Sequence, residues 1–130
     1  MAAPGIATRR GSILVVEDRD DVRRGLRELL ELNGFHVSDA RDAEQAWAQL
    51  GANPCGYSLI LLDLSLPGGV SGADLRRRQL ADATLSAIPT IVVTSLDLRP
   101  EDRRPLQPNA WLDKPYQLHD LLDLVNQYME

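Results

Sequence analysis

The stretch that decides the fold is Ser58-Leu59-Ile60-Leu61-Leu62-Asp63-Leu64. Its aliphatic run predicts a strand buried on both faces, as strands of parallel sheets are. An ionised carboxylate is costly inside such a core unless it is paired or binds a metal. Pro67-Gly68-Gly69 follows and indicates that the strand ends near Asp63. Because ligands bind at the carboxyl ends of strands in open parallel sheets, Asp63 is the first candidate for a functional residue.

Composition predicts a single globular domain. The chain has 130 residues, of which 44% are hydrophobic and 25% charged, so it can bury a core and global disorder is excluded. Its net charge of −5 argues against direct nucleic-acid binding, which needs a basic surface. Cys55 is the one cysteine, and the sequence lacks both a signal peptide and an apolar run long enough for a bilayer, so we expect a cytoplasmic protein without a membrane partner. We expect a flexible N-terminal tail over residues 1–11 and the folded domain over 12–130.

Strands and helices are predicted to alternate along the chain. Apolar runs predict strands at 12–16, 35–38, 58–64, 89–94 and 110–112. Helical spacing of apolar residues predicts helices over 20–33, from a cap at Asp42 to about residue 50, over 72–82 and over 117–128. This alternation is typical of βαβ units with right-handed crossovers. We therefore predict an α/β fold with a flavodoxin-like, doubly wound, five-stranded parallel sheet in the order 2-1-3-4-5.

Polar side chains follow four of the predicted strands and should meet at one edge of the sheet. They are Glu17 and Asp18, Asp63, Thr94 and Ser95, and Asp113 and Lys114. Two carboxylates ~4 Å apart repel by about 4 kcal/mol at an effective dielectric constant near 20, so either a proton or a divalent cation is expected among them. Oxygen ligands without His or Cys favour Mg²⁺ over zinc. A threonine hydroxyl and a lysine ammonium suit a phosphoryl group, which a carboxylate can accept covalently.

Each of these residues also has a structural explanation when it is taken alone. Glu17 and Asp18 could cap the following helix, where its dipole favours acidic residues. Thr94 could be an ordinary strand residue, and Lys114 a solvated surface charge. The functional interpretation depends on finding all of them at the ends of neighbouring strands.

The motifs resemble the receiver domain of two-component response regulators over residues 12–127. The resemblance is carried by Ile13-Leu14-Val15-Val16-Glu17-Asp18, Leu62-Asp63-Leu64-Ser65-Leu66-Pro67, Ile91-Val92-Val93-Thr94-Ser95 and Asp113-Lys114-Pro115. It implies a signalling domain rather than a classical enzyme, in which Asp63 is phosphorylated by a histidine kinase or a histidine phosphotransfer protein. It also implies that Mg²⁺ is bound by Asp18, Asp63 and the backbone carbonyl of Ser65, with Glu17 acting directly or through water.

The resemblance further assigns residues to the phosphoryl group and the switch. Lys114 would pair with the phosphoryl group, in a loop shaped by a cis bond to Pro115. Thr94, with Ser95 beside it, would bind the phosphoryl group and shift on phosphorylation. Trp111 stands where the family usually has a mobile Tyr or Phe, and the alternative is a packing tryptophan.

Two segments depart from the family pattern. The loop at 68–72 is about one residue longer than usual, as in receivers attached to hybrid histidine kinases. The span from Thr94 to Lys114 is about two residues short and contains Pro100, Pro105 and Pro108. Since proline disfavours helix interiors, we predict a loop, or at most a turn or two, in place of the fourth helix. The run 76–78, three arginines, is predicted to be a solvated helix face.

Alternative functions remain open from the sequence. The shortened fourth-helix region suggests a phosphorylation-independent docking module as the main alternative. A flavodoxin-like cofactor binder is disfavoured because the first strand ends in acids rather than in a glycine-rich phosphate loop. The chain could be a stand-alone regulator or part of a longer protein, possibly a hybrid histidine kinase.

Overall fold

A five-stranded parallel sheet forms the centre of the molecule. The computed structural model describes residues 11–66, 71–95 and 98–129. The strands are β1 (Ser12–Val16), β2 (His36–Ala40), β3 (Leu59–Asp63), β4 (Thr90–Ser95) and β5 (Ala110–Lys114). Their order is β2-β1-β3-β4-β5, and each pair of neighbours is parallel, which confirms the predicted topology. The predicted tail lies outside the described residues except for Gly11, whose carbonyl accepts a hydrogen bond from the backbone N–H of His36. The predicted longer loop also lies largely outside them.

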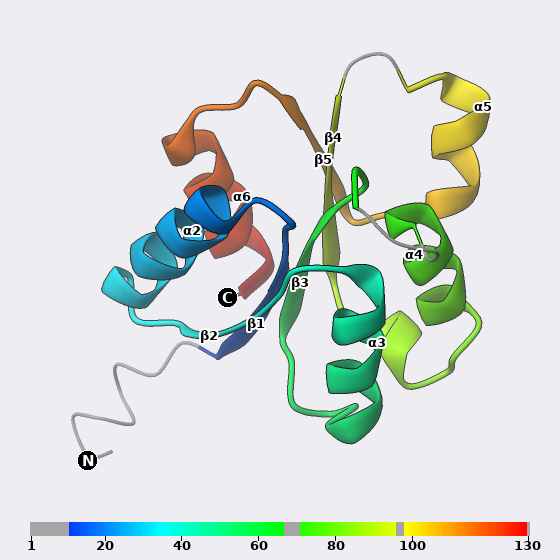
Figure 1. The fold of residues 1–130 in the computed structure, drawn as a ribbon, viewed down its shortest axis with the longest axis horizontal. Coiled ribbons are helices and arrows are strands. Elements are labelled where there is room, and N and C mark those ends of the chain that lie inside the picture. The colour runs from blue at the N-terminus through cyan, green and yellow to red at the C-terminus, as the bar shows by residue number, and fades with distance from the viewer. Residues whose placement is uncertain (1–10, 67–70, 96–97, 130) are drawn as a thin grey trace.

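Helices cover both faces of the sheet (Figure 1). They are α2 (Asp20–Leu32), α3 (Ala43–Ala52), α4 (Gly72–Leu80), α5 (Pro100–Arg103) and α6 (Leu118–Met129), with 3-10 turns η1 (Leu85–Ala87) and η2 (Arg104–Leu106). Helices α2 and α6 lie on one face, and α3 and α4 lie on the other. Of the helices in the described residues, none combines the length and the apolar character needed to span a bilayer.

Local sequence signals set the helix ends. The Asp42 carboxylate accepts the backbone N–H of Gln45 at 2.7 Å and caps α3, as predicted. Gly34 follows α2 with φ of 91° and donates its N–H to the Glu31 carbonyl. A left-handed residue directly after a helix is where glycine is favoured, so the helix stops there.

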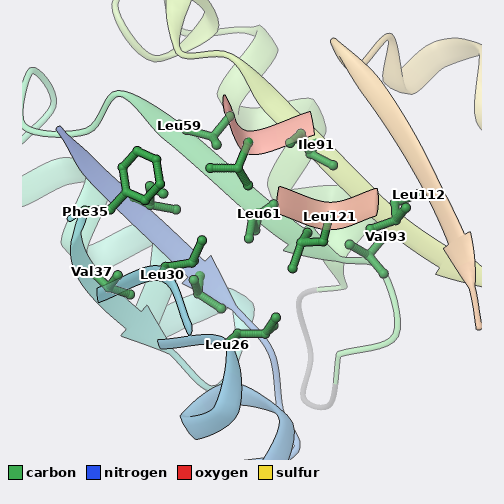
Figure 2. Packing of buried hydrophobic residues seen from close by; sticks show 13 residues of the cluster. Leu26, Leu30, Phe35, Val37, Leu59, Leu61, Ile91, Val93, Leu112 and Leu121 are labelled. Atoms are coloured by element: carbon green, nitrogen blue, oxygen red, sulfur yellow. The ribbon is translucent and has the colours of Figure 1, made fainter. Parts of the chain in front are cut away.

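Alternate strand residues build two separate cores. Ile13 and Val15 of β1 pack toward α2 and α6, whereas Leu14 and Val16 pack toward α3 and α4. Figure 2 shows the first core, in which side chains of α2 and α6 meet those of the central strands. Burial on both faces explains why these strands are continuously aliphatic, and it fixes the register that brings the strand ends together.

The segment between β4 and β5 has little helix, as its prolines predict. Pro100 occupies the first turn of α5, where a missing N–H is tolerated, and Pro105 lies in η2. Gln107 then adopts a left-handed conformation, with φ of 41° and ψ of 53°. The fourth-helix region is therefore reduced to α5 and η2.

The prediction for the arginine run is wrong at its first position. Arg77 and Arg78 are exposed, but Arg76 is 2% exposed. Its guanidinium donates to the carbonyls of Leu106 and Gln107 and to the Gln79 side chain. Arg76 is buried because η2 packs onto α4 and supplies carbonyl acceptors.

Candidate functional site

Three carboxylates converge where β1 and β3 end. Glu17 and Asp18 follow β1, and Asp63 is the last residue of β3. Pairing of Val16 with Leu62 aligns the two strand ends. One carboxylate oxygen from each acid lies within 4.8 Å of the others. Glu17 and Asp63 are 5% and 3% exposed, so their charges are poorly solvated.

Asp63 is held by donors on both of its oxygens. Lys114 Nζ lies 2.7 Å from Oδ2, and the backbone N–H of Ser65 donates to Oδ1 at 2.8 Å. Lys114 ends β5, two strands away from β3, and the Lys114–Pro115 peptide bond is cis, as expected from the resemblance. The sheet therefore fixes a carboxylate and a cation in direct contact.

The electrostatics of the cluster favour a bound cation or proton. The pKa of Glu17 is raised from 4.5 to about 7, chiefly by burial and also by the nearby Asp63, although the backbone N–H of Arg19 acts to lower it. Glu17 therefore resists ionisation beside the other two acids, and a bound cation would stabilise its ionised form. The donor set consists of oxygen atoms, which fits Mg²⁺. The Ser65 carbonyl as a further ligand stays a prediction.

Tyr116 belongs to the surroundings of the site, although it was not predicted. Burial raises the pKa of its hydroxyl, and the charges of Glu17 and Asp63 add to this. Together with residues of α2 and the β5–α6 loop, it lines a pocket of about 470 Å³. The lining is Glu17, Arg19, Val22, Lys114, Pro115 and Tyr116. In the sequence, the one feature that points to Tyr116 as a neighbour of the site is its position two residues after Lys114, which ends β5.

Gly72 lets α4 begin close to the site. A Cβ atom at Gly72 would lie 2.6 Å from the carbonyl oxygen of Asp63 and 2.7 Å from the Cα of Leu64. Both contacts are with backbone, which cannot swing away. Glycine is therefore required where α4 passes the end of β3.

The predicted switch residues lie on the next two strands of the sheet, Thr94 and Ser95 at the end of β4 and Trp111 within β5. Thr94 is 3% exposed and follows Val93, which pairs with Asp63. Its hydroxyl lies 3.5 Å from the carbonyl of Ser95, an exposed residue that ends β4. Trp111 pairs with Val92, so it lies further back along the sheet than Thr94, and it is half-buried. The structure thus brings Glu17, Asp18, Asp63 and Lys114 together, while switch roles for Thr94, Ser95 and Trp111 stay predictions.

Comparison with known proteins identifies the family and related sequences. The family model of the response regulator receiver domain matches residues 13–126. The response regulator receiver protein CpdR of Brucella abortus is 30% identical, and the alignment covers 90% of this chain and 95% of CpdR. The uncharacterized transcriptional regulatory protein YkoG of Bacillus subtilis is 35% identical over 87% of this chain and 48% of YkoG. The phosphate regulon transcriptional regulatory protein PhoB of Klebsiella pneumoniae is 34% identical over 90% and 51%. The chain thus spans about half the length of YkoG and PhoB.

Solved structures give the same result for the fold. A response regulator receiver protein from Pseudomonas putida is 32% identical, with a TM-score of 0.79 and coverage of 91% of this chain and 97% of that one. The signal receiver domain of a histidine kinase from Syntrophus aciditrophicus is 26% identical, with a TM-score of 0.82 and coverage of 92% and 89%. The strand order, the carboxylate cluster with its lysine and these matches agree, and the chain belongs to the response regulator receiver domain family.

Proposed function

We propose that Asp63 accepts a phosphoryl group from a phosphohistidine donor in a Mg²⁺-dependent reaction, and that the phosphorylated form changes its interactions with partners. The observation that carries the proposal is the 2.7 Å contact of Lys114 with Asp63 inside a cluster of three acids. A structural salt bridge alone would not require two further carboxylates beside it. Lys114, together with a cation held by the three acids, would offset the charge of a phosphoryl group that is doubly negative.

The chain's own residues would divide the work of the transfer. A carboxylate oxygen of Asp63 attacks phosphorus, an O–P bond forms, and the P–N bond to the donor imidazole breaks. Glu17, Asp18 and Asp63 would hold Mg²⁺, which when bound offsets negative charge on the carboxylates and on the phosphoryl oxygens. Lys114 supplies a fixed ammonium for the incoming phosphoryl oxygens, and the Ser65 N–H keeps the Asp63 carboxylate oriented.

The pocket beside the acids supports approach of the donor from this side. It joins Glu17 and Lys114 to the apolar surface of Val22 and Pro115. Leu118, at the start of α6, is 55% exposed close to Pro115 in sequence. A histidine kinase or phosphotransfer protein is the proposed donor, and the cytoplasmic location expected from the sequence is part of the same proposal.

Phosphorylation is tested with a small phosphodonor. Intact mass should increase by one phosphoryl group in the presence of Mg²⁺, and the gain should be lost with EDTA and in Asp63→Asn. Asp123→Asn removes an exposed acid of α6 and serves as the matched control, which should be phosphorylated like the parent protein.

A second experiment uses the phosphohistidine donors of the source organism. Failure of every such donor, together with an unmodified mass in the first experiment, would overturn the proposal. Partner binding that is identical in the parent protein and in Asp63→Asn would instead support a phosphorylation-independent docking module.

A further inference from the structure

The indole ring of Trp111 lies under the guanidinium of Arg103. The guanidinium carbon of Arg103 lies 4.9 Å from the centre of the indole ring, within the range of a cation–π interaction. Next to the ring is a surface pocket of about 280 Å³, lined by Pro100, Arg103, Arg104, Gln107, Pro108 and Trp111. The indole is thus held in place on one side and has open space on another.

The same guanidinium also donates hydrogen bonds to residues of β4 and β5. Its Nη2 donates to Asp113 Oδ1 at 2.9 Å and to the Ser95 carbonyl at 3.4 Å. Asp113 belongs to β5 and precedes Lys114, and Ser95 ends β4 directly after Thr94. Arg103 itself lies on α5. One side chain therefore connects α5 to the end of β4 and to Trp111 and Asp113 of β5.

We propose that these contacts of Arg103 with Trp111, Asp113 and Ser95 form a latch that stabilises the unphosphorylated state and is released by phosphorylation. The proposal rests on the proposed function, because it names how that site is regulated. In the resting protein the latch holds Trp111 under Arg103 and fixes the end of β4.

The link to Asp63 runs through Thr94. The Ser95 carbonyl lies near two donors, the Thr94 hydroxyl at 3.5 Å and Arg103 at 3.4 Å. A phosphoryl group on Asp63 brings strong acceptor oxygens to the end of β3, beside β4. A Thr94 hydroxyl that turns to those oxygens moves the adjoining peptide, and with it the carbonyl that Arg103 binds.

The other arginines of this segment lack this arrangement. Arg99, which precedes α5, pairs with Glu101 and Asp102 of that helix. Arg104 lines the same pocket but makes no ion pair with any residue that the structure describes. Arg104→Met is therefore a matched control for Arg103→Met, since both remove one arginine from the pocket.

The test follows Trp111 fluorescence in a Trp47→Phe background, where Trp111 is the one tryptophan. Quenching of Trp111 fluorescence by acrylamide is measured without and with beryllofluoride, which mimics the phosphoryl group and is added together with Mg²⁺. We expect Arg103→Met to raise quenching of the unmodified protein to the level that the mimic produces in the Trp47→Phe parent. We also expect the half-saturating mimic concentration to fall about tenfold, because a ligand and a conformational equilibrium affect each other reciprocally.

Asp113→Asn removes the ion pair from the opposite side and should shift both readouts in the same direction. Arg104→Met should leave both within about twofold of the parent. If Arg103→Met behaves like Arg104→Met while the parent responds to the mimic, the latch is refuted and the proposed function stands. If the parent itself gives no response to the mimic and takes no phosphoryl group, the proposed function fails, and the latch fails with it.

Discussion

Replacing Arg76 with methionine should destabilise the domain through loss of an internal anchor. Arg76 Nε donates to the Leu106 carbonyl at 2.8 Å, Nη1 to Gln79 Oε1 at 2.7 Å, and Nη2 to the Gln107 carbonyl at 2.7 Å. Burial lowers the pKa of the guanidinium, yet arginine stays charged in proteins. Methionine fills a similar volume but donates no hydrogen bond.

The magnitude follows from what each acceptor can find afterwards. Gln79 Oε1 lies 3.3 Å from the Thr90 hydroxyl, whose one proton it shares with the Ile88 carbonyl at 3.1 Å. Gln107 is exposed, so water can replace the guanidinium at its carbonyl. The Leu106 carbonyl belongs to a residue that is 1% exposed, so it loses its donor in a buried setting. An unsatisfied buried acceptor costs roughly 1–3 kcal/mol, and the other two bonds add to this, so we expect a loss of about 2–4 kcal/mol. That corresponds to a Tm lower by roughly 10 °C in a domain of this size.

The assay is urea unfolding together with thermal unfolding of Arg76→Met and Arg77→Met. Arg77 is the next residue of α4, is exposed and pairs with Asp74 at the surface, so its replacement should have little effect. A stability loss in Arg76→Met no larger than in Arg77→Met would refute the assignment of Arg76 as an anchor.

Three further predictions concern the site. The Glu17 pKa is raised from 4.5 to about 7, chiefly by burial, so the folded protein retains a proton that the unfolded chain loses between these values. In the metal-free protein, the contribution of Glu17 to the free energy of unfolding should therefore be largest below pH 4.5. It should fall by roughly 2–3 kcal/mol as the pH rises to about 7. Glu17→Gln should flatten that slope in urea unfolding, and an unchanged slope would contradict the assignment. Lys114→Met should slow phosphorylation at least about tenfold in a mass time course, because no other residue offers an ammonium to Asp63 in the described part of the chain; an unchanged rate would count against its role. Gly72→Ala should cost about 1–3 kcal/mol by urea unfolding, since its Cβ would meet the Asp63 carbonyl. Gly25→Ala, where nothing lies within 4 Å, should instead gain up to about 1 kcal/mol, and equal effects would refute the crowding argument.

The sequence predicted β1, β3 and β4 because each is a distinct aliphatic run, and the alternation of strands with helices predicted the strand order. Asp63 could be recognised because a carboxylate is conspicuous after such a run, and its partners because they follow other runs. Boundaries were less accurate: the strand predicted at 35–38 is observed as β2, His36–Ala40. Its last residues are polar or small, so their pairing with β1 is decided by the register and not by hydrophobicity.

Arg76 shows what the sequence pattern could have revealed and did not. The buried residues of α4 are Gly72, Leu75, Arg76 and Gln79, which is the i, i+3, i+4, i+7 spacing of a buried helix face. Two of the four are polar, so hydrophobicity alone conceals the face. The partner of Arg76 is a turn about thirty residues away whose carbonyls point to α4, and only tertiary structure supplies it. Arg103 was missed for the same reason.

The way in which Arg76 holds η2 has a consequence for how this surface can change. The anchor binds main-chain carbonyls of Leu106 and Gln107, not the side chains of the residues before them. Side chains at 99–105 are therefore not part of this attachment, and Arg103 has its separate contacts with Trp111, Asp113 and Ser95. The fold thus separates the attachment of this segment from the side chains that it presents to solvent, so evolution or a designer can vary those side chains while the scaffold stays the same.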